Sequence, residues 1–182
     1  MFTTDRLILR EFKDGDLDSL LALRNEPSVQ RGVTSQPTVP RPTKYKEFLK
    51  ELAENSTIWF TIILKETGGF VGQCSIKATE PQKNRDAVFG ISMFPEFWGK
   101  GYGTEATRFT VDYAFKALGV QRVSLTVLEG NPGAIAVYKK VGFQIEGRKR
   151  RANWVEGKWE DLLSMGVLDQ EWAALYSKGT PS

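Results

Sequence analysis

Three glycines at alternate positions are the feature of this sequence that most directly suggests chemistry. Gly99, Gly101 and Gly103 lie in FWGKGYGTEAT, between a strand-like segment and residues that favour a helix. Glycine costs about 0.5–1 kcal/mol relative to alanine inside a regular element, so this concentration requires a reason. One reason is an ordinary tight turn. The other is a loop whose backbone N–H groups surround an anion at the start of a helix.

The spacing of these glycines narrows the choice of ligand. A P-loop has four residues between its first glycine and GK[ST], and dinucleotide-binding proteins carry G-x-G-x-x-G; this run matches neither. Nucleoside triphosphates and nicotinamide cofactors are therefore disfavoured. Several charge-assisted hydrogen bonds of about 1.5–3 kcal/mol each would still hold a pyrophosphate without a dedicated arginine.

The residue types that usually carry acid–base and metal chemistry are scarce. The chain has no histidine and one cysteine, Cys74. The usual zinc-ligand spacings cannot be assembled without histidine, so we expect no metal centre. The lone cysteine excludes an internal disulfide, fits a reducing, cytoplasmic setting, and is expected to pack as a small hydrophobic residue. Proton transfer must then fall to carboxylates, tyrosine or water.

Length and composition are those of one globular domain. The 182 residues are 41% hydrophobic and 26% charged, with a net charge of +3, and we expect a single domain over residues 1–182. No apolar run approaches the roughly 20 residues of a membrane helix, and no secretory signal is visible. The small net charge does not favour nucleic-acid binding, although it would not repel an anionic cofactor.

Hydrophobic periodicity predicts the elements that precede the glycines. Alternation over residues 6–12 predicts a strand, and amphipathic spacing predicts helices over 14–25 and 43–54. The intervening segment, 32–42, is rich in Gly, Thr, Ser and Pro and is predicted to be a mobile loop. Three strand-like runs then follow with short polar turns between them, which predicts an antiparallel meander; they span 58–65, 70–78 and 86–94.

Helix signals are clearer after the glycines. A helix is predicted over 104–118, and a strand over 122–130. Asn131 as N-cap, Pro132 at the first helical position and Gly142 as terminator predict a short helix between them.

The last third of the chain completes the pattern. Strands are predicted over 143–155 and 158–168, joined by a tight Glu-Gly turn, while 169–182 is predicted to be a tail without a clear pattern. Together these elements predict one α+β domain on a mostly antiparallel sheet.

Two motifs in this order carry a resemblance. PEFWGKGYGTEA, after FGISMF, resembles the acetyl-coenzyme A (acetyl-CoA) loop of the GNAT-type N-acetyltransferase superfamily, whose motif is Q/R-x-x-G-x-G/A. NPGAIAVYKKVGF resembles the next signature, an Asn that opens a helix carrying a Tyr and ending in K-x-G-F. RLILRE and EGKWEDLLSMGVL further resemble the branch that contains ribosomal-protein alanine and spermidine acetyltransferases. The resemblance covers about residues 3–168, with Trp98 in place of the motif's Gln or Arg and Ala134 in place of a frequent Ser.

The resemblance implies a fold and a cosubstrate. The fold is the GNAT fold, a mixed, mostly antiparallel twisted sheet of about seven strands flanked by about four helices. Acetyl-CoA would pair its pantetheine arm with strand residues 91–93 as an added strand, and residues 98–104 would wrap its pyrophosphate. The residues implied to bind it are Ile91, Ser92, Met93, Trp98, Gly99, Lys100, Gly101, Tyr102, Gly103, Thr104, Asn131, Tyr138 and Lys140.

The implied reaction is direct attack of a primary amine on the thioester, which gives an acetamide and free coenzyme A. Tyr138 is by resemblance the donor that protonates the leaving thiolate, although its neighbours also fit a packed core tyrosine. Glu96 beside the loop and Glu160 or Asp161 on the last strand are candidate bases. An N–H near residues 91–93 is placed to stabilise the developing oxyanion.

Some alternatives stay open on the sequence alone. A non-catalytic acetyl-CoA-binding module would need the same loop and would hold a partner through the basic run at 148–151. That run also fits a solvated strand edge that prevents aggregation. Within the enzyme class, a peptide N-terminus, a polyamine or another small amine would each serve as acceptor, and no oligomeric state is indicated.

Overall fold

The computed structural model describes residues 1–32 and 38–176. These residues form one sheet whose strands run in the order β1-β2-β3-β4-β5-β6-β8-β7. All neighbouring strands pair antiparallel except β5 and β6, which are parallel. The strands are β1 (Phe2–Thr3), β2 (Leu7–Arg10), β3 (Ile58–Leu64), β4 (Phe70–Ala78), β5 (Asp86–Met93), β6 (Arg122–Leu128), β7 (Gln144–Val155) and β8 (Lys158–Leu168).

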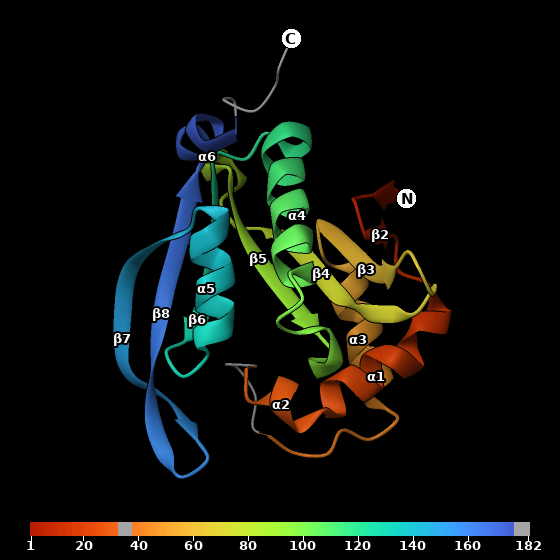
Figure 1. Ribbon diagram of the computed structural model, residues 1–182. Helices are drawn as coiled ribbons and strands as arrows, with labels where there is room; N and C mark the ends of the chain where they lie inside the picture. Colours follow the sequence, from red (N-terminus) through yellow and green to blue (C-terminus); the bar gives the residue numbers. More distant parts are fainter. Residues whose placement is uncertain (33–37, 177–182) are drawn as a thin grey trace.

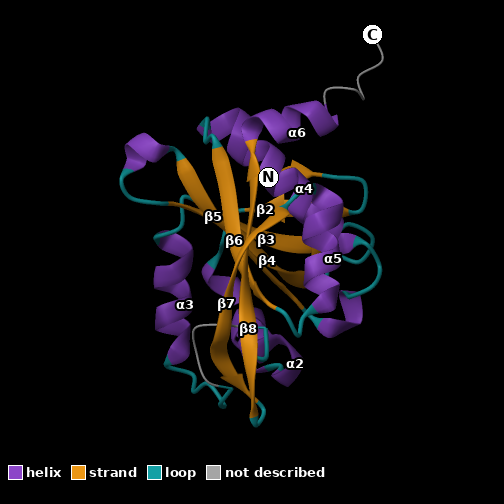
Figure 2. Ribbon diagram, turned by 90° about the vertical axis from the view of Figure 1, so that its left-hand side faces the viewer, coloured by secondary structure: helices purple, strands orange, loops and turns teal. Residues whose placement is uncertain are grey.

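Helices cover both faces of this sheet. Helices α4 and α5 lie side by side on one face, and α3 lies on the opposite face (Figures 1 and 2). The helices are α1 (Leu17–Asn25), α2 (Pro27–Gln30), α3 (Tyr45–Glu54), α4 (Tyr102–Leu118), α5 (Pro132–Val141) and α6 (Asp169–Tyr176), with 3-10 turns η1 (Asp14–Asp16), η2 (Gln82–Asn84) and η3 (Pro95–Phe97).

The larger core lies beneath α4 and α5. Small and branched residues of α4, including Ala106, Val111 and Ala114, are fully buried against the strands. Cys74 of β4 and Thr110 of α4 share a hydrogen bond of 3.1 Å, which fixes the helix over the centre of the sheet. Close packing of this kind holds the start of α4 rigidly beside the end of β5.

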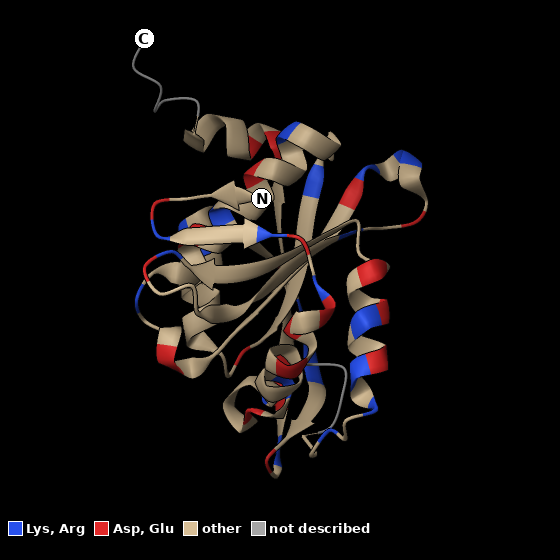
Figure 3. Cartoon of the chain, turned by 90° about the vertical axis from the view of Figure 1, so that its right-hand side faces the viewer, with Lys and Arg blue, Asp and Glu red and all other residues tan. Residues whose placement is uncertain are grey.

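A second, smaller core lies beneath α1 and α3. Leu20, Leu49 and Trp59 are buried there, so both helices turn their apolar stripe to the sheet. On the same face, buried Asp16 accepts hydrogen bonds from Arg10 at 2.6 Å and from Thr61 at 2.9 Å. The outer surface of α3, at the right of Figure 3, carries acidic and basic residues in alternation and faces solvent.

The architecture agrees with the predicted α+β class and with the predicted meander of β3, β4 and β5. The sheet has eight strands rather than about seven, because Phe2 and Thr3 add a short edge strand to β2. The predicted helix over 14–25 is divided into η1 and α1, and helix α2 was not predicted. Of the loop predicted over 32–42, residues 33–37 lie outside the described part of the chain.

The prediction of a patternless tail from residue 169 is wrong for its first part. Residues Asp169–Tyr176 form α6, and Trp172 within it is buried. The Trp172 indole N–H donates to Asp112 of α4 at 3.0 Å, so the helix is held by tertiary contacts. Residues 177–182 lie outside the described part. No helix in the described residues is long and apolar enough to cross a membrane.

Candidate active site

The unpaired edge of β5 is the first component of the site. The β5–β6 ladder ends at the pair Val88–Ser124, yet β5 continues to Met93. Beyond Val88 the edge of β5 that faces β6 therefore has no paired strand among the described residues. An extended molecule with amide groups is able to complete such an edge by hydrogen bonding.

Strand register decides which residues face this edge. Phe94 N–H donates to Val71 of β4 and Thr79 N–H donates to Asp86 of β5, so the even-numbered residues of β5 direct their backbone groups at β4. Because backbone direction alternates along a strand, Ile91 and Met93 direct theirs to the open edge.

This alternation divides the three predicted strand residues. Ile91 and Met93 are available to a ligand, whereas the backbone of Ser92 is committed to Gln73 of β4. The prediction that Ser92 pairs its backbone with the cofactor is therefore wrong in this register. Its side chain lies instead on the face of the sheet covered by α1 and α3.

The glycine loop is the second component. Gly99 and Gly101 have φ of 71° and 84°, left-handed values that glycine adopts without strain. A Cβ at Gly99 would meet no protein atom within 4 Å, so the backbone there borders open space. Gly101 is the N-cap of α4 and supplies no side-chain cap, which leaves the first N–H groups of a long helix directed at that space.

Two aromatic residues brace the loop. The Trp98 indole N–H donates to the carbonyl of Met93 at 2.9 Å, which ties the loop to the last residue of β5. Trp98 thus occupies the carbonyl of Met93, which points to the open edge of β5. The N–H of Met93 stays directed to that edge. The ring of Tyr102 lies under the Arg6 guanidinium, 4.5 Å from its centroid, and contacts Phe97.

Arg6 contacts the glycine loop, and sequence reasoning did not single it out. Its Nη1 donates to the carbonyl of Lys100 at 2.8 Å, and its Nε donates to Glu105 at 2.8 Å. Glu105 also accepts from Thr4 Oγ1 at 2.6 Å. The N-terminal segment therefore clamps the glycine loop in the conformation that exposes its amides. These partners are about a hundred residues apart in sequence, and no local pattern signals the contact.

These features fit the acetyl-CoA that the resemblance implies. The edge at Ile91 and Met93 would hold the pantetheine amides, and the amides at Gly99–Thr104 would hold the pyrophosphate. Gly103 fits the same role. A Cβ at this position would make only ordinary contacts with Met93 and Val137, so packing within the protein does not require glycine there. The exposed side chain of Lys100 makes no ion pair to any described residue, and Thr104 is partly exposed in the first turn of α4.

Helix α5 carries the two next predicted residues, Asn131 at its start and Tyr138 against Phe89 of β5. Asn131 is the N-cap, and its Oδ1 accepts from Ala134 N–H at 3.1 Å, as the sequence predicts. Gly142 closes the helix with φ of 118°. Lys140 is exposed and makes no ion pair to a described residue, so its predicted cofactor contact stays a prediction.

Tyr138 is the buried polar residue of α5. Its ring packs edge-to-face against Phe89 of β5 at 6.3 Å and Phe143 at 5.9 Å. The hydroxyl makes no hydrogen bond within the described residues, and burial raises the pKa of Tyr138 to about 12. The side chain is thus both a core residue and a protonated phenol placed next to β5.

The three candidate carboxylates have different surroundings. Glu96 on η3 is exposed and has no ion pair in the described chain. Glu160 is 12% exposed, contacts Gly130 next to Asn131, and pairs with Lys158 at 3.1 Å. Asp161 accepts from Arg151 N–H at 2.8 Å and from Arg148 at 3.0 Å, and these bonds lower its pKa. A carboxylate with a lowered pKa is a weak base, so its role as general base is disfavoured.

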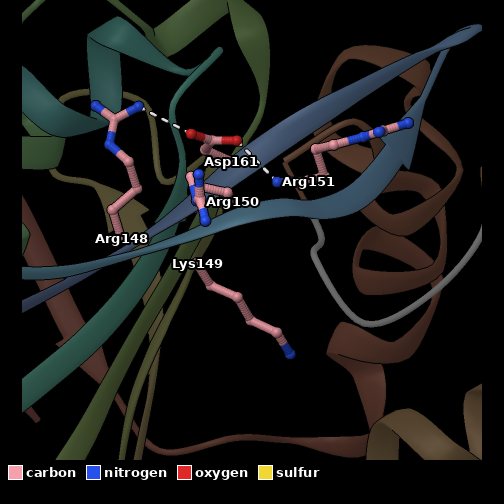
Figure 4. Close-up of a pocket in the computed structure, with 5 residues that line it drawn as sticks. All are labelled: Arg148, Lys149, Arg150, Arg151 and Asp161. Carbon is pink, nitrogen blue, oxygen red and sulfur yellow. Dashed lines mark hydrogen bonds and ion pairs between the residues drawn. The ribbon is translucent and has the colours of Figure 1, made fainter.

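The basic run at 148–151 lies on β7, the outermost strand, and lines a recess of about 720 Å³ with Asp161 (Figure 4). Arg148 pairs with Glu129 at 2.7 Å and with Asp161. Arg151 stands at a bulge with φ of 50°, over the ring of Trp159. Half of the run is thus already neutralised or stacked, which favours the solvated edge over a nucleic-acid surface.

The end of α2 meets the β7–β8 hairpin near the start of α5. Arg31 Nε lies 3.5 Å from Glu156 at the hairpin tip. A Cβ on Gly32 would lie 3.5 Å from Asn131 Nδ2, so the chain after α2 passes beside the N-terminus of α5. These contacts bring the end of α2 and the tip of the β7–β8 hairpin beside the N-terminus of α5.

Comparison with known proteins identifies this arrangement. Residues 6–144 match the family model described as acetyltransferase (GNAT) domain. An uncharacterized N-acetyltransferase, p20 of Bacillus licheniformis, is 29% identical over 93% of this chain and 97% of its own. A putative ribosomal N-acetyltransferase, YdaF of Bacillus subtilis, is 36% identical over 58% of this chain and 57% of its own.

Solved structures agree on the fold. Spermidine N-acetyltransferase from Vibrio cholerae, in complex with CoA and spermine, superposes with a TM-score of 0.80 over 93% of this chain and 99% of that chain, at 24% identity. The match of the family model to most of the chain shows that this protein belongs to the GNAT family and is an acetyl-CoA-dependent N-acetyltransferase.

Proposed function

We propose that the chain transfers the acetyl group of acetyl-CoA directly to a primary amine at the open edge of β5, without an acetylated enzyme. The observation that carries this proposal is the edge of β5 from Phe89 to Met93, which starts where the β5–β6 ladder ends and has no partner strand among the described residues. Acetyl-CoA supplies the acetyl group as a thioester whose carbonyl oxygen gains negative charge when an amine attacks. Groups of the protein must stabilise this charge and transfer the protons.

The N–H groups of Ile91 and Met93 are the proposed stabilisers of that charge. They lie in a strand held on its other side by β4, so little reorganisation is needed. Removing one such donor in other enzymes costs about 2.7–4 kcal/mol in transition-state free energy, which makes this the largest expected contribution of a single group. Trp98 supports it by holding the end of β5.

Tyr138 is the proposed proton donor to the leaving thiolate. Its raised pKa keeps the hydroxyl protonated at neutral pH, and its ring is locked against Phe89 of β5. Positioned acids contribute about 10²–10⁴-fold to rate. Cys74 has no proposed role: its thiol is fully buried, and burial raises its pKa to about 12.

For the base, Glu160 has more geometric support than Asp161. Glu160 is largely shielded from solvent and contacts the loop that opens α5, whereas Asp161 is held by two donors. We therefore propose that the ammonium group of the acceptor loses its proton to Glu160 or to water held near it. Glu96 stays a candidate without a supporting contact.

The acceptor is proposed to be a peptide N-terminus or a small amine rather than a polycation. Relatives are named for spermidine and for ribosomal substrates. In this chain the carboxylates of the β7–β8 hairpin are paired with cations: Glu156 with Arg31, Glu160 with Lys158, and Asp161 with Arg148. A long polyamine needs several carboxylates that are not paired in this way.

The test is release of coenzyme A thiol across a panel of amines, with acetyl-CoA and the intact protein. The panel contains dipeptides, amino acids, monoamines and spermidine. Turnover of a monoamine or peptide that exceeds turnover of spermidine supports the proposal. Tight acetyl-CoA binding without turnover of any amine would contradict it, and an isolable acetyl-enzyme would contradict the direct route.

A further inference from the structure

Buried polar atoms without partners concentrate on one face of the sheet. Within the described residues, side-chain atoms that are buried and lack a hydrogen bond are Arg24 Nε, Gln30 Oε1, Trp59 Nε1, Gln73 Oε1 and Thr107 Oγ1. Thr107 belongs to α4, but the other four come from α1, α2, β3 and β4. Native proteins rarely leave buried polar atoms unsatisfied, so a concentration of them points to a ligand or bound solvent.

The four atoms belong to one neighbourhood, which we call the polar patch. Thr61 pairs with Gln73 and bonds to Asp16, so Gln73 faces the α1 side of the sheet. Trp59 is the diagonal neighbour of Gln73 on the same face and packs with Leu20. Arg24 lies one helical turn beyond Leu20 on the same stripe of α1.

Gln30 and Arg24 are connected directly. The Gln30 side chain is buried, and its Nε2 donates to the carbonyl of Arg24 at 2.7 Å and to that of Val39 at 3.0 Å. The end of α2 is therefore tied to the end of α1 and to the chain at Val39. The arrangement is preorganised and does not depend on exposed side chains.

Arg24 is the unusual member of the patch. Its Nε is buried without a hydrogen bond, the side chain as a whole is partly buried, and it forms no ion pair with any residue that the structure describes. Burial is the main cause that lowers the pKa of Arg24; Tyr45 opposes it, and the positive charge of Arg41 adds a smaller lowering. An enclosed arginine without a carboxylate is destabilising by itself, because desolvation is not compensated by a counter-charge.

The patch lies next to β5, on its β4 side, so that β5 itself separates it from the open edge. Gln73 pairs with Ser92 of β5, and Ser92 stands between Ile91 and Met93. The polar patch is thus on the α1 face of the sheet, beside the strand whose odd-numbered residues direct their backbone groups to the open edge. A group bound at Arg24 would place the rest of a small molecule along Gln73 toward β5.

We propose that Arg24 binds a carboxylate of the acceptor, so that the substrate is an amine that also carries a carboxylate, such as an amino acid. This inference rests on the proposed function, since it names the acceptor of that site. A planar guanidinium with one positive charge matches one carboxylate, through paired N–H donors. Trp59 Nε1 is a further donor, and Gln73 Oε1 is an acceptor for a polar group on the same molecule.

The test compares amino acids with the amines that lack only the carboxylate. Suitable pairs are phenylalanine with phenethylamine, methionine with 3-(methylthio)propylamine, and lysine with cadaverine. The wild type is expected to prefer the carboxylated member at least tenfold in kcat/KM in a pair that turns over. Arg24→Met is expected to lose about 10- to 100-fold of that preference, the usual effect of a hydrogen bond to a charged group. The KM for acetyl-CoA should not change.

A stability measurement separates the inference from the proposed function. The Tm of the wild type should rise with at least one N-acetyl amino acid out of a panel of twenty, and the Tm of Arg24→Met should not. Without ligand, Arg24→Met should be as stable as the wild type or more stable, because an unpaired enclosed charge has been removed. Arg31→Met, which removes a half-exposed cation nearby, is the matched control and should keep the carboxylate preference.

Each outcome has a meaning for the inference. Equal turnover of both members of every pair, or a preference that survives in Arg24→Met, overturns it. A wild type that turns over no amine but is stabilised by N-acetyl amino acids through Arg24 supports the carboxylate site and contradicts the proposed function. If no N-acetyl amino acid stabilises the wild type and no amino acid is acetylated, the carboxylate assignment fails.

Discussion

Replacing Gly101 with alanine tests the glycine loop without removing any side chain. Gly101 has φ of 84°, and an added Cβ would lie 3.1 Å from Arg6 Nη2. Left-handed torsions cost a non-glycine residue about 1–2 kcal/mol, and the close approach requires Arg6 to shift. Arg6 holds the carbonyl of Lys100, so the substitution disturbs the clamp as well as the turn.

The expected effect has two parts. Strain of about 1–2 kcal/mol should lower the Tm by about 2–8 °C in a protein of this size. Loss of one charge-assisted hydrogen bond to the pyrophosphate, worth about 1.5–3 kcal/mol, should raise the Kd for acetyl-CoA roughly 10- to 100-fold. Calorimetric titration measures the Kd, and a thermal melt measures the Tm.

Gly68 provides the matched control. It has φ of 69° in the β3–β4 turn, and an added Cβ would meet nothing within 4 Å. Gly68→Ala should therefore lose similar stability but bind acetyl-CoA like the wild type. If Gly101→Ala binds as tightly as Gly68→Ala, the loop does not hold the pyrophosphate and the reasoning is refuted.

Three further substitutions test other parts of the account. Tyr138→Phe should reduce kcat about 10²- to 10⁴-fold with little change in acetyl-CoA affinity, and normal turnover would reduce Tyr138 to a packing residue. The pKa of Tyr138 in the folded protein is raised to about 12. The stability that Tyr138 contributes is therefore complete below about pH 10 and is lost as the pH rises toward 12. The Tm of Tyr138→Phe should accordingly depend less on pH in that range. Burial raises the pKa of Asp16, but hydrogen bonds from Arg10, Lys13 N–H and Thr61 outweigh burial and lower it. The stability that these bonds give is present above about pH 4 and is lost as the pH falls further. The Tm of Asp16→Asn, measured as the pH is lowered, should lack that loss. Cys74→Ala should keep full turnover in steady-state assays, and a loss beyond tenfold would reopen a covalent route.

Local sequence signals predicted most elements of the fold. The bounds of β4 and β8 agree with the predicted strands, and Asn131, Pro132 and Gly142 punctuate α5 as expected. The missed elements depend on partners far along the chain. Phe2 and Thr3 form a strand only because β2 offers an edge, and α6 is fixed by Trp172 reaching Asp112.

The site was predictable to the level of segments but not of individual groups. The glycine run and the strand before it were recognised, whereas the direction of Ile91, Ser92 and Met93 depends on the register with β4. Asp161 was a candidate base from the sequence. A bulge in β7 brings the N–H of Arg151 to it, and no local pattern predicts that contact.

Arg6 and Arg24 are further residues whose contacts could not be predicted from the sequence. Each is an ordinary charged residue in an amphipathic segment, and the sequence gives no reason to single it out. Arg6 acquires its role by crossing to Glu105 and Lys100, and Arg24 by being enclosed without a counter-charge. Both properties arise only when distant segments pack together.

The central claim is that acetyl-CoA binds along the open edge of β5. Amide hydrogen exchange followed by NMR, with and without saturating acetyl-CoA, tests it at single residues. The N–H groups of Ile91 and Met93 should exchange freely in the free protein and become protected in the complex, together with those of Gly101 to Thr104. The N–H of Ser92, already bonded to β4, should be protected in both states. Saturation with acetyl-CoA that leaves the exchange of Ile91 and Met93 unchanged would contradict the account.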